Sequence, residues 1–282
     1  MQKIVLVTGA STGIGAACAH QLSGRGFRVF AGVRRDVDGA ALADHSSGRI
    51  TPLILDITNP RDIAAAAARI GEDTGGALVG LVNNAGIAVA GPLEFVAIDD
   101  FRLQLEVNVV GHLAVTQAML PMLRERMGRI VNVSSVAGKF AQPFVGPYSA
   151  SKFALEALSD ALRIELAPWK IAVSVIEPGA VTTPIWQKSL TASVARQQRM
   201  PEQVQHMYGR ALALTTKFAL QADRDGVAAA TVAAAVEHAL TAARPRIRYR
   251  VGRQAKAQIA LTRILPDRVR DELIFRSAHL PR

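Results

Sequence analysis

Tyr148 and Lys152 stand four residues apart in this sequence, and a serine pair, Ser134 and Ser135, ends thirteen residues before the tyrosine. Residues four apart share one face of a helix, so this spacing sets an ammonium beside a phenol. The pKa of an unperturbed phenol is about 10, and a nearby cation lowers it. We therefore predict that Tyr148 moves a proton on or off a substrate oxygen, to which one of the two serines donates a hydrogen bond.

A glycine-rich run is suited to binding phosphate. Residues 8–15 read Thr-Gly-Ala-Ser-Thr-Gly-Ile-Gly, after an apolar strand-like segment and at the start of a helical one. Gly9 permits a tight turn, Gly13 lets the backbone approach a pyrophosphate, and Gly15 lets the helix pack against the strand. The spacing differs from the general Gly-x-Gly-x2-Gly fingerprint. We expect a dinucleotide to be held by Gly9, Ser11, Gly13, Ile14 and Gly15.

The end of the second strand-like run bears on which dinucleotide is used. An acidic residue there binds the ribose hydroxyls of NAD, whereas an arginine accommodates the 2'-phosphate of NADP. The expected acidic position holds Val33, and Arg34 follows it. NADP is therefore the predicted cofactor. Asp36 is near enough to keep NAD as the alternative.

Seven apolar, strand-like runs alternate with helical segments along the chain. The runs lie at 4–7, 28–33, 50–55, 78–82, 129–133, 171–176 and 247–251, and the clearest helical segments cover 14–23, 63–71, 101–127 and 149–167. Near-continuously apolar strands separated by helices predict an α/β fold, a doubly wound, seven-stranded parallel sheet with helices on both faces. We expect one domain over residues 1–282.

Two stretches depart from this alternation. The interval 182–225 is largely helical and carries no strand-like run. We interpret its residues 184–225 as a substrate lid, with an ordinary surface helix pair as the alternative. Residues 252–282 form a basic extension, and eleven basic against three acidic side chains between Arg244 and the end supply +8 of the net charge of +10.

Composition narrows the class of protein. Cys18 is the one cysteine and lies in an apolar helical stretch, so a buried, inert thiol and a cytoplasmic location are expected. The N-terminus has no signal-peptide pattern. Arginines alternate with apolar residues over 246–251, which favours a strand with one wet face over a nucleic-acid-binding arm. We expect no nucleic-acid partner and no metal; attachment of the basic extension to a membrane surface is a minor alternative.

Six motifs occur in the order seen in short-chain dehydrogenases/reductases, which the first 185 residues or so resemble. They are the glycine run, Asn83-Asn-Ala-Gly86, Asn108, Ser135, Tyr148-x3-Lys152 and Pro178-Gly-x-Val-x-Thr183. The resemblance implies a Rossmann-like enzyme that moves a hydride between a nicotinamide and an alcohol or carbonyl carbon. The family interval selects Ser135 over Ser134, and the implied catalytic residues are Asn108, Ser135, Tyr148 and Lys152.

The resemblance also assigns contacts along the cofactor. Tyr148 and Lys152 would contact the cofactor as well, with Lys152 at the nicotinamide ribose, and Asn108 would help to bind a water that connects Lys152 to solvent. Asp56 would accept from the adenine amino group, or instead belong to a helix N-cap near Asn59. Residues near the adenosine ribose would be Asn83, Ala85 and Gly86, unless Asn83 chiefly ties neighbouring strands together. The nicotinamide would be gripped by Pro178, Gly179, Val181 and Thr183.

Within the family the chain looks most like the branch of retinol and hydroxysteroid dehydrogenases, on residues 139–160, 175–179 and 245–268. This implies an apolar, retinoid-, steroid- or lipid-like secondary alcohol or ketone, with a small non-lipid carbonyl as an alternative substrate. A non-catalytic dinucleotide sensor is the alternative of another class. The mouth of the site, or else the core, would contain Phe140, Phe144, Val145 and Trp186. Helices 101–127 and 149–167 commonly join subunits in the family, so a homodimer or homotetramer is expected.

Overall fold

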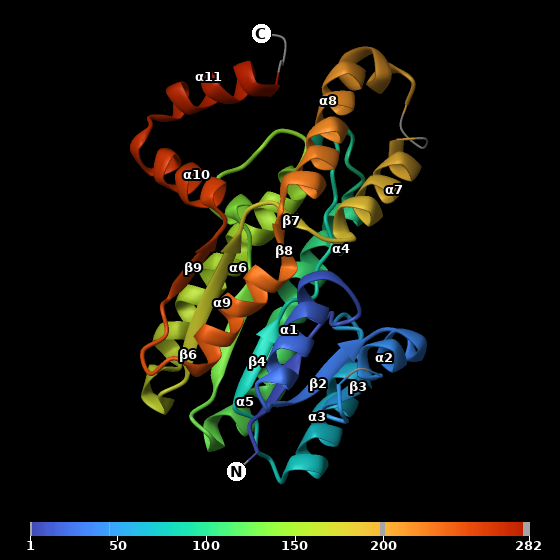
Figure 1. The fold of residues 1–282 in the computed structure, drawn as a ribbon. Helices are drawn as coiled ribbons and strands as arrows, with labels where there is room; N and C mark the ends of the chain where they lie inside the picture. Colours follow the sequence, from blue (N-terminus) through green and yellow to red (C-terminus); the bar gives the residue numbers. More distant parts are fainter. Residues whose placement is uncertain (1, 45, 198–200, 279–282) are drawn as a thin grey trace.

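The computed structural model describes residues 2–44, 46–197 and 201–278 of the chain (Figure 1). Seven strands form one parallel sheet in the order β3-β2-β1-β4-β5-β6-β9. This confirms the predicted doubly wound, Rossmann-like sheet. The strands are β1 (Ile4–Val7), β2 (Arg28–Val33), β3 (Ile50–Ile54), β4 (Gly80–Asn83), β5 (Arg129–Val133), β6 (Ala172–Pro178) and β9 (Arg248–Val251).

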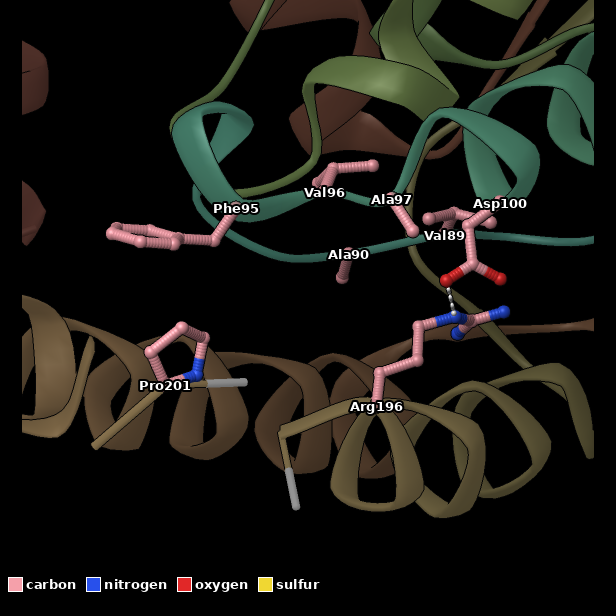
Figure 2. A pocket seen from close by; sticks show the side chains of 8 residues that line it. All are labelled: Val89, Ala90, Phe95, Val96, Ala97, Asp100, Arg196 and Pro201. Atoms are coloured by element: carbon pink, nitrogen blue, oxygen red, sulfur yellow. Dashed lines mark ion pairs between the residues drawn. The ribbon is translucent and has the colours of Figure 1, made fainter. Parts of the chain in front are cut away.

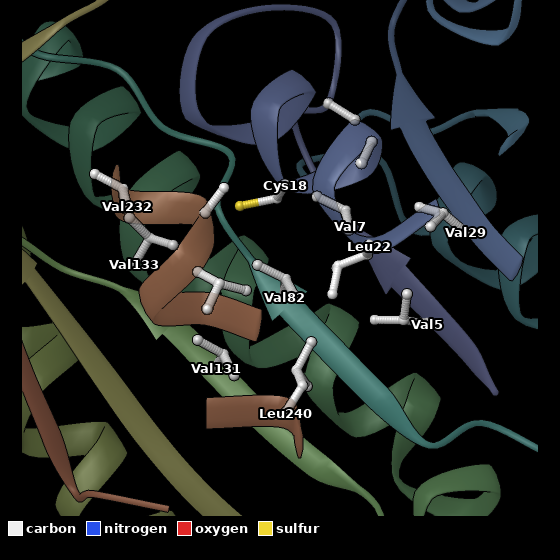
Figure 3. Close-up of a cluster of buried hydrophobic side chains, with 14 of the residues drawn as sticks. Val5, Val7, Cys18, Leu22, Val29, Val82, Val131, Val133, Val232 and Leu240 are labelled. Atoms are coloured by element: carbon white, nitrogen blue, oxygen red, sulfur yellow. The ribbon is translucent and has the colours of Figure 1, made fainter. Parts of the chain in front are cut away.

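Helices cover both faces of the sheet because successive side chains of a strand point to opposite sides. Val5 and Val7 of β1 face α1 (Gly13–Gly24), α2 (Asp36–Ala43) and α9 (Ala229–Thr241), and Figure 3 shows this apolar layer. Ile4 and Leu6 face the opposite layer, which contains α3 (Pro60–Thr74) and α5 (Gly111–Glu125). Both sets of side chains are buried, as the continuously apolar strands predicted.

Cys18 lies inside the first of these layers (Figure 3). Its side chain has no solvent exposure, and burial raises the pKa of the thiol to about 12. The thiolate is the reactive form of cysteine. The thiol is therefore neutral at physiological pH, in agreement with the expected inert cysteine.

The long helical segment expected at 101–127 is not uniformly α-helical. It consists of α4 (Ile98–Leu105), a π-helical turn (Glu106–Val110) and α5. The π turn contains the predicted site residue Asn108. Such turns are frequent at functional sites because they change the direction of the side chains around them. The other long helix, α6 (Gly146–Glu165), carries Tyr148 and Lys152 as predicted.

The largely helical interval 182–225, called the excursion below, has a short strand at each end that the sequence pattern did not predict. β7 (Val181–Thr182) pairs in parallel with β8 (Val227–Ala228), so the interval beginning at residue 182 does contain strand. Between them stand α7 (Ile185–Gln197) and α8 (Gln203–Asp225), while residues 198–200 of the excursion lie outside the described residues. Both helices project beyond the end of the sheet at which the site residues gather (Figure 1).

The basic extension forms α10 (Arg253–Ile264) and α11 (Asp267–Ala278), and residues 279–282 lie outside the described residues. α10 packs on the domain through the buried Ala255 and Ile259, whereas Leu273 and Phe275 of α11 are exposed. None of the helices in the described part of the chain has the length and apolar character needed to cross a membrane. Short 3-10 turns occur at Leu93–Phe95, Val136–Gly138 and Ala167–Trp169.

Candidate active site

The predicted site residues gather at the carboxyl edge of the sheet. β1 lies between β2 and β4, where the strand order changes direction, and ligands of open α/β sheets bind outside the carboxyl ends of the strands at such a point. The glycine turn follows β1, Ser135 follows β5, and the segment that begins at Pro178 follows β6. The topology therefore brings three separate sequence motifs to one edge.

The glycine turn leaves room that side chains would fill. Gly9 and Gly13 have φ of +62° and +61°, the left-handed region that favours glycine. A Cβ on Gly9 would lie 2.7 Å from the Cα of Ala85, and one on Gly15 would lie 2.2 Å from the carbonyl oxygen of Gly9 and 2.5 Å from Nδ2 of Asn84. Gly15 thus packs against the turn itself, which corrects the expected packing against the strand.

The same turn has the features of a phosphate cradle. Thr12 is the N-cap of α1, and the first turn of that helix contains no acidic residue. The amides at a helix N-terminus lack carbonyl partners within the helix, and the helix dipole attracts anions there. Ser11 and Ile14 flank this N-terminus. The residues therefore fit the pyrophosphate of a dinucleotide.

Thr8 and Asn84 fix the turn to the end of β4, and neither was predicted as a site residue. Thr8 Oγ1 accepts hydrogen bonds from the backbone N–H groups of Asn84 (3.0 Å) and Ala85 (3.1 Å). Asn84 Nδ2 donates to the carbonyl oxygens of Thr8 (3.0 Å) and Gly9 (3.1 Å). Both residues adjoin predicted site residues in the sequence, which was the only signal for their role. The bonds themselves could not be predicted, because they link segments some 75 residues apart.

Arg34 stands exposed just beyond the end of β2. Val33 before it is only 2% exposed and faces the core, while Arg35 after it pairs with Asp38 at 2.7 Å. No ion pair or hydrogen bond of Arg34 occurs among the residues that the structure describes. Asp36 is exposed at the first residue of α2. Arg34 is therefore an exposed cation at the position predicted to distinguish the two dinucleotides, and Asp56 is the acid near it.

Asp56 is held by neighbouring groups rather than acting as a helix cap. Its Oδ1 accepts from the backbone N–H (2.9 Å) and hydroxyl (2.7 Å) of Thr58. Burial acts to raise its pKa, but these bonds and the charge of Arg34 outweigh burial and lower it. The N-cap of α3 is Asn59, whose side chain accepts from the N–H of Arg61. Asp56 is thus an ionised acceptor beside Arg34.

The Asn83 side chain ties strands together, which was the alternative given for it. Its Nδ2 donates to Asn132 Oδ1 on β5 and to Thr116 Oγ1 on α5, both at 2.9 Å. Ala85 and Gly86 follow it at the strand end. A Cβ on Gly86 would lie 3.4 Å from Asn108 Oδ1, so this backbone passes close to the π turn.

His112 is a buried neighbour of the site that the sequence analysis missed. Its Nε2 lies 2.6 Å from the carbonyl oxygen of Ala85. Burial and the charge of Lys152 lower its pKa to about 3. His112 is therefore neutral near pH 7 and supports the backbone at Ala85 rather than exchanging protons. No short sequence motif marks this role.

Ser135, Tyr148 and Lys152 come together as predicted. Ser135 lies close enough to the Tyr148 phenol to act on its pKa, whereas Ser134 is buried with its Oγ 3.0 Å from the position that a Cβ on Gly138 would occupy. Geometry therefore agrees with the choice of Ser135. Lys152 Nζ lies 5.7 Å from the centre of the Tyr148 ring and donates to the carbonyl oxygen of Val133 at 2.9 Å.

The pKa of Tyr148 shifts in the opposite direction to the one expected from the sequence. We expected Lys152 to lower it, but in the protein by itself burial raises the pKa of Tyr148 and only the Ser135 hydrogen bond opposes this. The Lys152 ammonium is directed to Val133 rather than to the phenol oxygen. Burial also lowers the pKa of Lys152 to about 8. Tyr148 is therefore a protonated phenol at neutral pH.

Asn108 connects the π turn to α6, the helix of Tyr148 and Lys152. Its Oδ1 accepts from the N–H of Ile87 (2.9 Å), and its Nδ2 donates to Ile87 O (3.0 Å) and to Ser151 Oγ (3.1 Å). Ser151 in turn donates to the carbonyl oxygen of Tyr148 at 2.7 Å. The described contacts make Asn108 a residue that orients the helix of Tyr148; the water contact stays a prediction.

The segment after β6 meets the glycine turn. A Cβ on Gly13 would lie 3.2 Å from the Cβ of Thr183, so the motif predicted for the nicotinamide end lies against the one predicted for the pyrophosphate. The N–H of Gly179, which follows Pro178, donates to the carbonyl oxygen of Val251, and Val181 is buried. This contact places the two cofactor motifs on one continuous surface.

The excursion makes two polar contacts with the chain that follows β4, one with α4 and one with the 3-10 turn before it. Arg196 of α7 pairs with Asp100 of α4 at 3.1 Å, at one end of a cavity of about 190 Å³ (Figure 2). Tyr208 of α8 donates to Glu94 at 2.9 Å, and its ring meets those of Phe95 and Phe144 edge to face. The rest of the cavity lining is largely apolar and comprises Val89, Ala90, Val96, Ala97 and Pro201 with Phe95.

The four residues expected at the mouth separate into two groups. Phe140 is only 8% exposed and belongs to the core, the alternative given for these residues. Phe144 and Val145 are partly exposed beside Tyr148, and Trp186 donates from Nε1 to the carbonyl oxygen of Val181 at 2.8 Å. Phe144 therefore lies between α6 and the excursion, where its ring meets that of Tyr208.

Comparison with known proteins decides the family. Residues 3–194 match the family model of short chain dehydrogenases. The chain belongs to the short-chain dehydrogenase family. It is 39% identical to retinol dehydrogenase 5 of Mus musculus over 96% of this chain and 87% of that protein. It is 37% identical to 17-beta-hydroxysteroid dehydrogenase type 6 of Bos taurus over 98% and 88%. These relatives confirm the predicted branch.

Solved structures of short-chain dehydrogenases share the fold along the chain. One from Burkholderia cenocepacia, in complex with NADP, has a TM-score of 0.73 and 27% identity, covering 100% of both chains. Another from Burkholderia phymatum, in complex with NAD, has a TM-score of 0.80 and 25% identity, covering 92% of each. The two similar proteins thus hold different dinucleotides.

Proposed function

We propose that this short-chain dehydrogenase uses a nicotinamide dinucleotide to interconvert a secondary alcohol and a ketone, with Tyr148 as the acid and base. The juxtaposition of Ser135 and Tyr148, with the Lys152 ammonium over the face of the ring, carries the proposal. The glycine cradle at the same edge supports a dinucleotide. The retinol and hydroxysteroid dehydrogenases among its relatives support the reaction class.

Each residue has a distinct task in ketone reduction. A bound reduced dinucleotide supplies the hydride to the carbonyl carbon. Tyr148, protonated at neutral pH, donates its proton to the carbonyl oxygen, so that the ketone gains a hydride and a proton and becomes an alcohol. Ser135 donates a hydrogen bond to the same oxygen and stabilises the negative charge that develops there.

Lys152 stabilises the phenolate that remains on Tyr148. Its ammonium lies 5.7 Å from the ring centre and is anchored on the carbonyl oxygen of Val133, so it does not have to reorganise when the charge appears. Oxidation of an alcohol runs through the same groups in reverse, with the phenolate accepting the alcohol proton. The raised pKa of Tyr148 favours the protonated, reductive form in the protein alone.

We propose NADP as the preferred dinucleotide because Arg34 is exposed and unpaired among the described residues at the end of β2. A guanidinium there can pair with the 2'-phosphate. Arg34→Glu should reverse the preference, lowering the kcat/KM ratio of NADP to NAD by about 100-fold, because a charge-assisted hydrogen bond of about 1.5–3 kcal/mol is replaced by repulsion.

Arg35→Glu is the matched control, because Arg35 is a neighbouring exposed arginine that already pairs with Asp38. The measurement is the kinetics of wild type and both variants with each dinucleotide at one ionic strength. A preference of the wild type for NAD, or equal effects of the two substitutions, would contradict the assignment to Arg34.

The proposed substrate is a bulky, apolar secondary alcohol or ketone. The partly apolar cavity beside the excursion, the aromatic group of Phe95, Phe144 and Tyr208, and the relatives' names support this class. The test is a panel of retinoid, steroid and short aliphatic alcohols and ketones with each dinucleotide. We expect the highest kcat/KM with a retinoid or steroid. A higher value with a short aliphatic carbonyl would favour the small-carbonyl alternative.

A further inference from the structure

A second buried charged group lies one helical turn beyond Lys152. Glu156 follows it on the same face of α6 and is only 4% exposed, and Glu177 at the end of β6 is fully buried. Buried carboxylates are rarely tolerated without partners, because loss of hydration destabilises the charge. Neither Glu156 nor Glu177 can be a solvated surface charge, so each needs partners within the protein.

Cations from two other segments hold these carboxylates. Lys139 Nζ lies 2.6 Å from Glu156 Oε2 and 3.6 Å from Glu177 Oε1. Arg248 Nε lies 3.1 Å from Glu156 Oε2 and 3.2 Å from Glu177 Oε1, and Arg250 lies 3.4 Å from Glu177. The arginines of β9 therefore face buried acids, which corrects the expected solvated face.

The group spans the segments that carry the proposed catalytic residues. Lys139 follows the 3-10 turn after Ser135, Glu156 shares α6 with Tyr148, and Glu177 directly precedes the Pro178 motif. The turn and helix are in close contact, because a Cβ on Gly138 would lie 3.0 Å from the carbonyl oxygen of Lys152 and 3.1 Å from Cγ of Glu156. A displacement at Glu156 would be transmitted to both.

Lys152 needs this support because its ammonium is itself buried. It is 4% exposed, and the hydrogen bond to Val133 is the one found for its side chain among the described residues. A backbone carbonyl carries no net charge, so it cannot by itself balance a buried ammonium. Glu156 is the nearest acid along the helix, and it is anchored on both sides.

We propose that Glu156 is a positioning residue for the reaction: held by Lys139 and Arg248, its carboxylate keeps the Lys152 ammonium charged and holds α6 against the Ser135 turn. The inference rests on the proposed function, because it concerns the lysine that stabilises the Tyr148 phenolate. Asp160, which pairs with Arg248 at 2.6 Å, forms the outer end of the group and is more exposed than Glu156.

The charged groups around Lys152 act on its pKa in the direction that this role requires. Burial lowers the pKa of Lys152 to about 8, and Glu156 opposes that shift. His112 on α5 faces Lys152 but is neutral near pH 7, and Tyr148 is protonated. Glu177 on β6 is itself buried beside Glu156, and its pKa is raised despite Lys139, Arg248 and Arg250. Glu156 thus supplies the negative charge that sustains the ammonium.

The test is a direct titration of Lys152 by NMR of protein labelled at the lysine side chains, with the signal assigned by Lys152→Met. It uses the full chain and needs neither substrate nor dinucleotide. Glu156→Gln should lower the Lys152 pKa by about one unit, since an opposite charge nearby typically accounts for 1–3 units. Glu156→Asp, which keeps the charge, should restore most of the shift.

Two further variants separate charge from structure. Lys139→Met should raise the Lys152 pKa, because a nearby cation is lost and Glu156 has one counter-ion fewer, and the absence of a rise contradicts the role if Glu156→Gln does not fold. Asp160→Asn, which removes another partner of Arg248, should leave the Lys152 pKa unchanged. An unchanged Lys152 pKa in the folded Glu156→Gln or Lys139→Met variant overturns the inference.

The failure of this inference is distinguishable from failure of the proposed function. If Tyr148→Phe abolishes turnover but the Lys152 pKa does not respond to Glu156, the function stands and the positioning role is wrong. In an active enzyme, one limb of the kcat pH profile should report the titration of Lys152. Glu156→Gln should shift that limb in the same direction as it shifts the Lys152 pKa measured by NMR. An unmoved limb contradicts the role in the reaction.

Discussion

Replacing Tyr148 with phenylalanine is expected to lower kcat by about 10²–10⁴-fold, the range that a positioned acid or base contributes. The substitution removes the phenol oxygen and leaves the ring, so the packing of α6 beside Lys152 is retained. Dinucleotide binding should be unchanged, because the glycine cradle and Arg34 lie on other segments. Turnover would be measured with the best substrate of the panel, and binding by the fluorescence of the reduced dinucleotide.

Tyr249→Phe is the matched control for this prediction. Tyr249 is buried and hydrogen-bonded, to His238 at 2.8 Å and to the N–H of Arg246 at 3.0 Å, and it lies on β9 away from Ser135. Loss of its hydroxyl should lower stability by about 1 kcal/mol without a selective loss of kcat. If Tyr148→Phe turns over substrate as fast as wild type, the proposed mechanism is wrong.

Gly15→Ala is expected to weaken dinucleotide binding by about 10–100-fold, which corresponds to the 1–3 kcal/mol that overpacking typically causes. The added Cβ would lie 2.2 Å from the carbonyl oxygen of Gly9 and 2.9 Å from the Cα of Ala10. Both neighbours are backbone atoms of the turn, so relief of the clash has to move the amides that would bind phosphate. Titration with each reduced dinucleotide measures the loss.

Gly24→Ala is the control for the glycine variant, since it makes the same substitution in the same helix. Nothing lies within 4 Å of the Cβ position at Gly24, and its φ is outside the left-handed region. Binding by this variant should equal that of wild type, with stability unchanged or slightly raised because alanine favours the helix. Equal binding by Gly15→Ala and wild type would rule out the phosphate cradle at this turn.

Local spacing predicted the parts of the site that lie within one element. Tyr148 and Lys152 share a face of α6 because the helical repeat places residues four apart on one side. The glycine turn was predictable for a similar reason, since positive φ at Gly9 and Gly13 follows from short-range backbone sterics. The seven apolar runs likewise predicted the parallel sheet, because strands buried on both faces must be continuously apolar.

Distant contacts decided what the same residues do. Asn83 was expected near a ribose, but its amide is used by Asn132 and Thr116 on two other elements. For Ser135 the fold agrees with the family interval, since Ser135 is the serine that acts on the Tyr148 phenol. The use of the Asn83 amide does not follow from spacing, because it depends on the strand order and on how a helix is seated on the sheet.

The sequence by itself determined the family, the sheet, the glycine cradle and the pairing of a tyrosine with a lysine on one helix face. Only the tertiary structure decided the electrostatics of that pair: burial raises the Tyr148 pKa and lowers that of Lys152, and the ammonium is directed to Val133. It also placed Arg248 of the last strand against Glu156 of α6. The physical reason is that helix and strand periodicity are local, whereas desolvation and charge pairing depend on residues that the fold brings in from far along the chain.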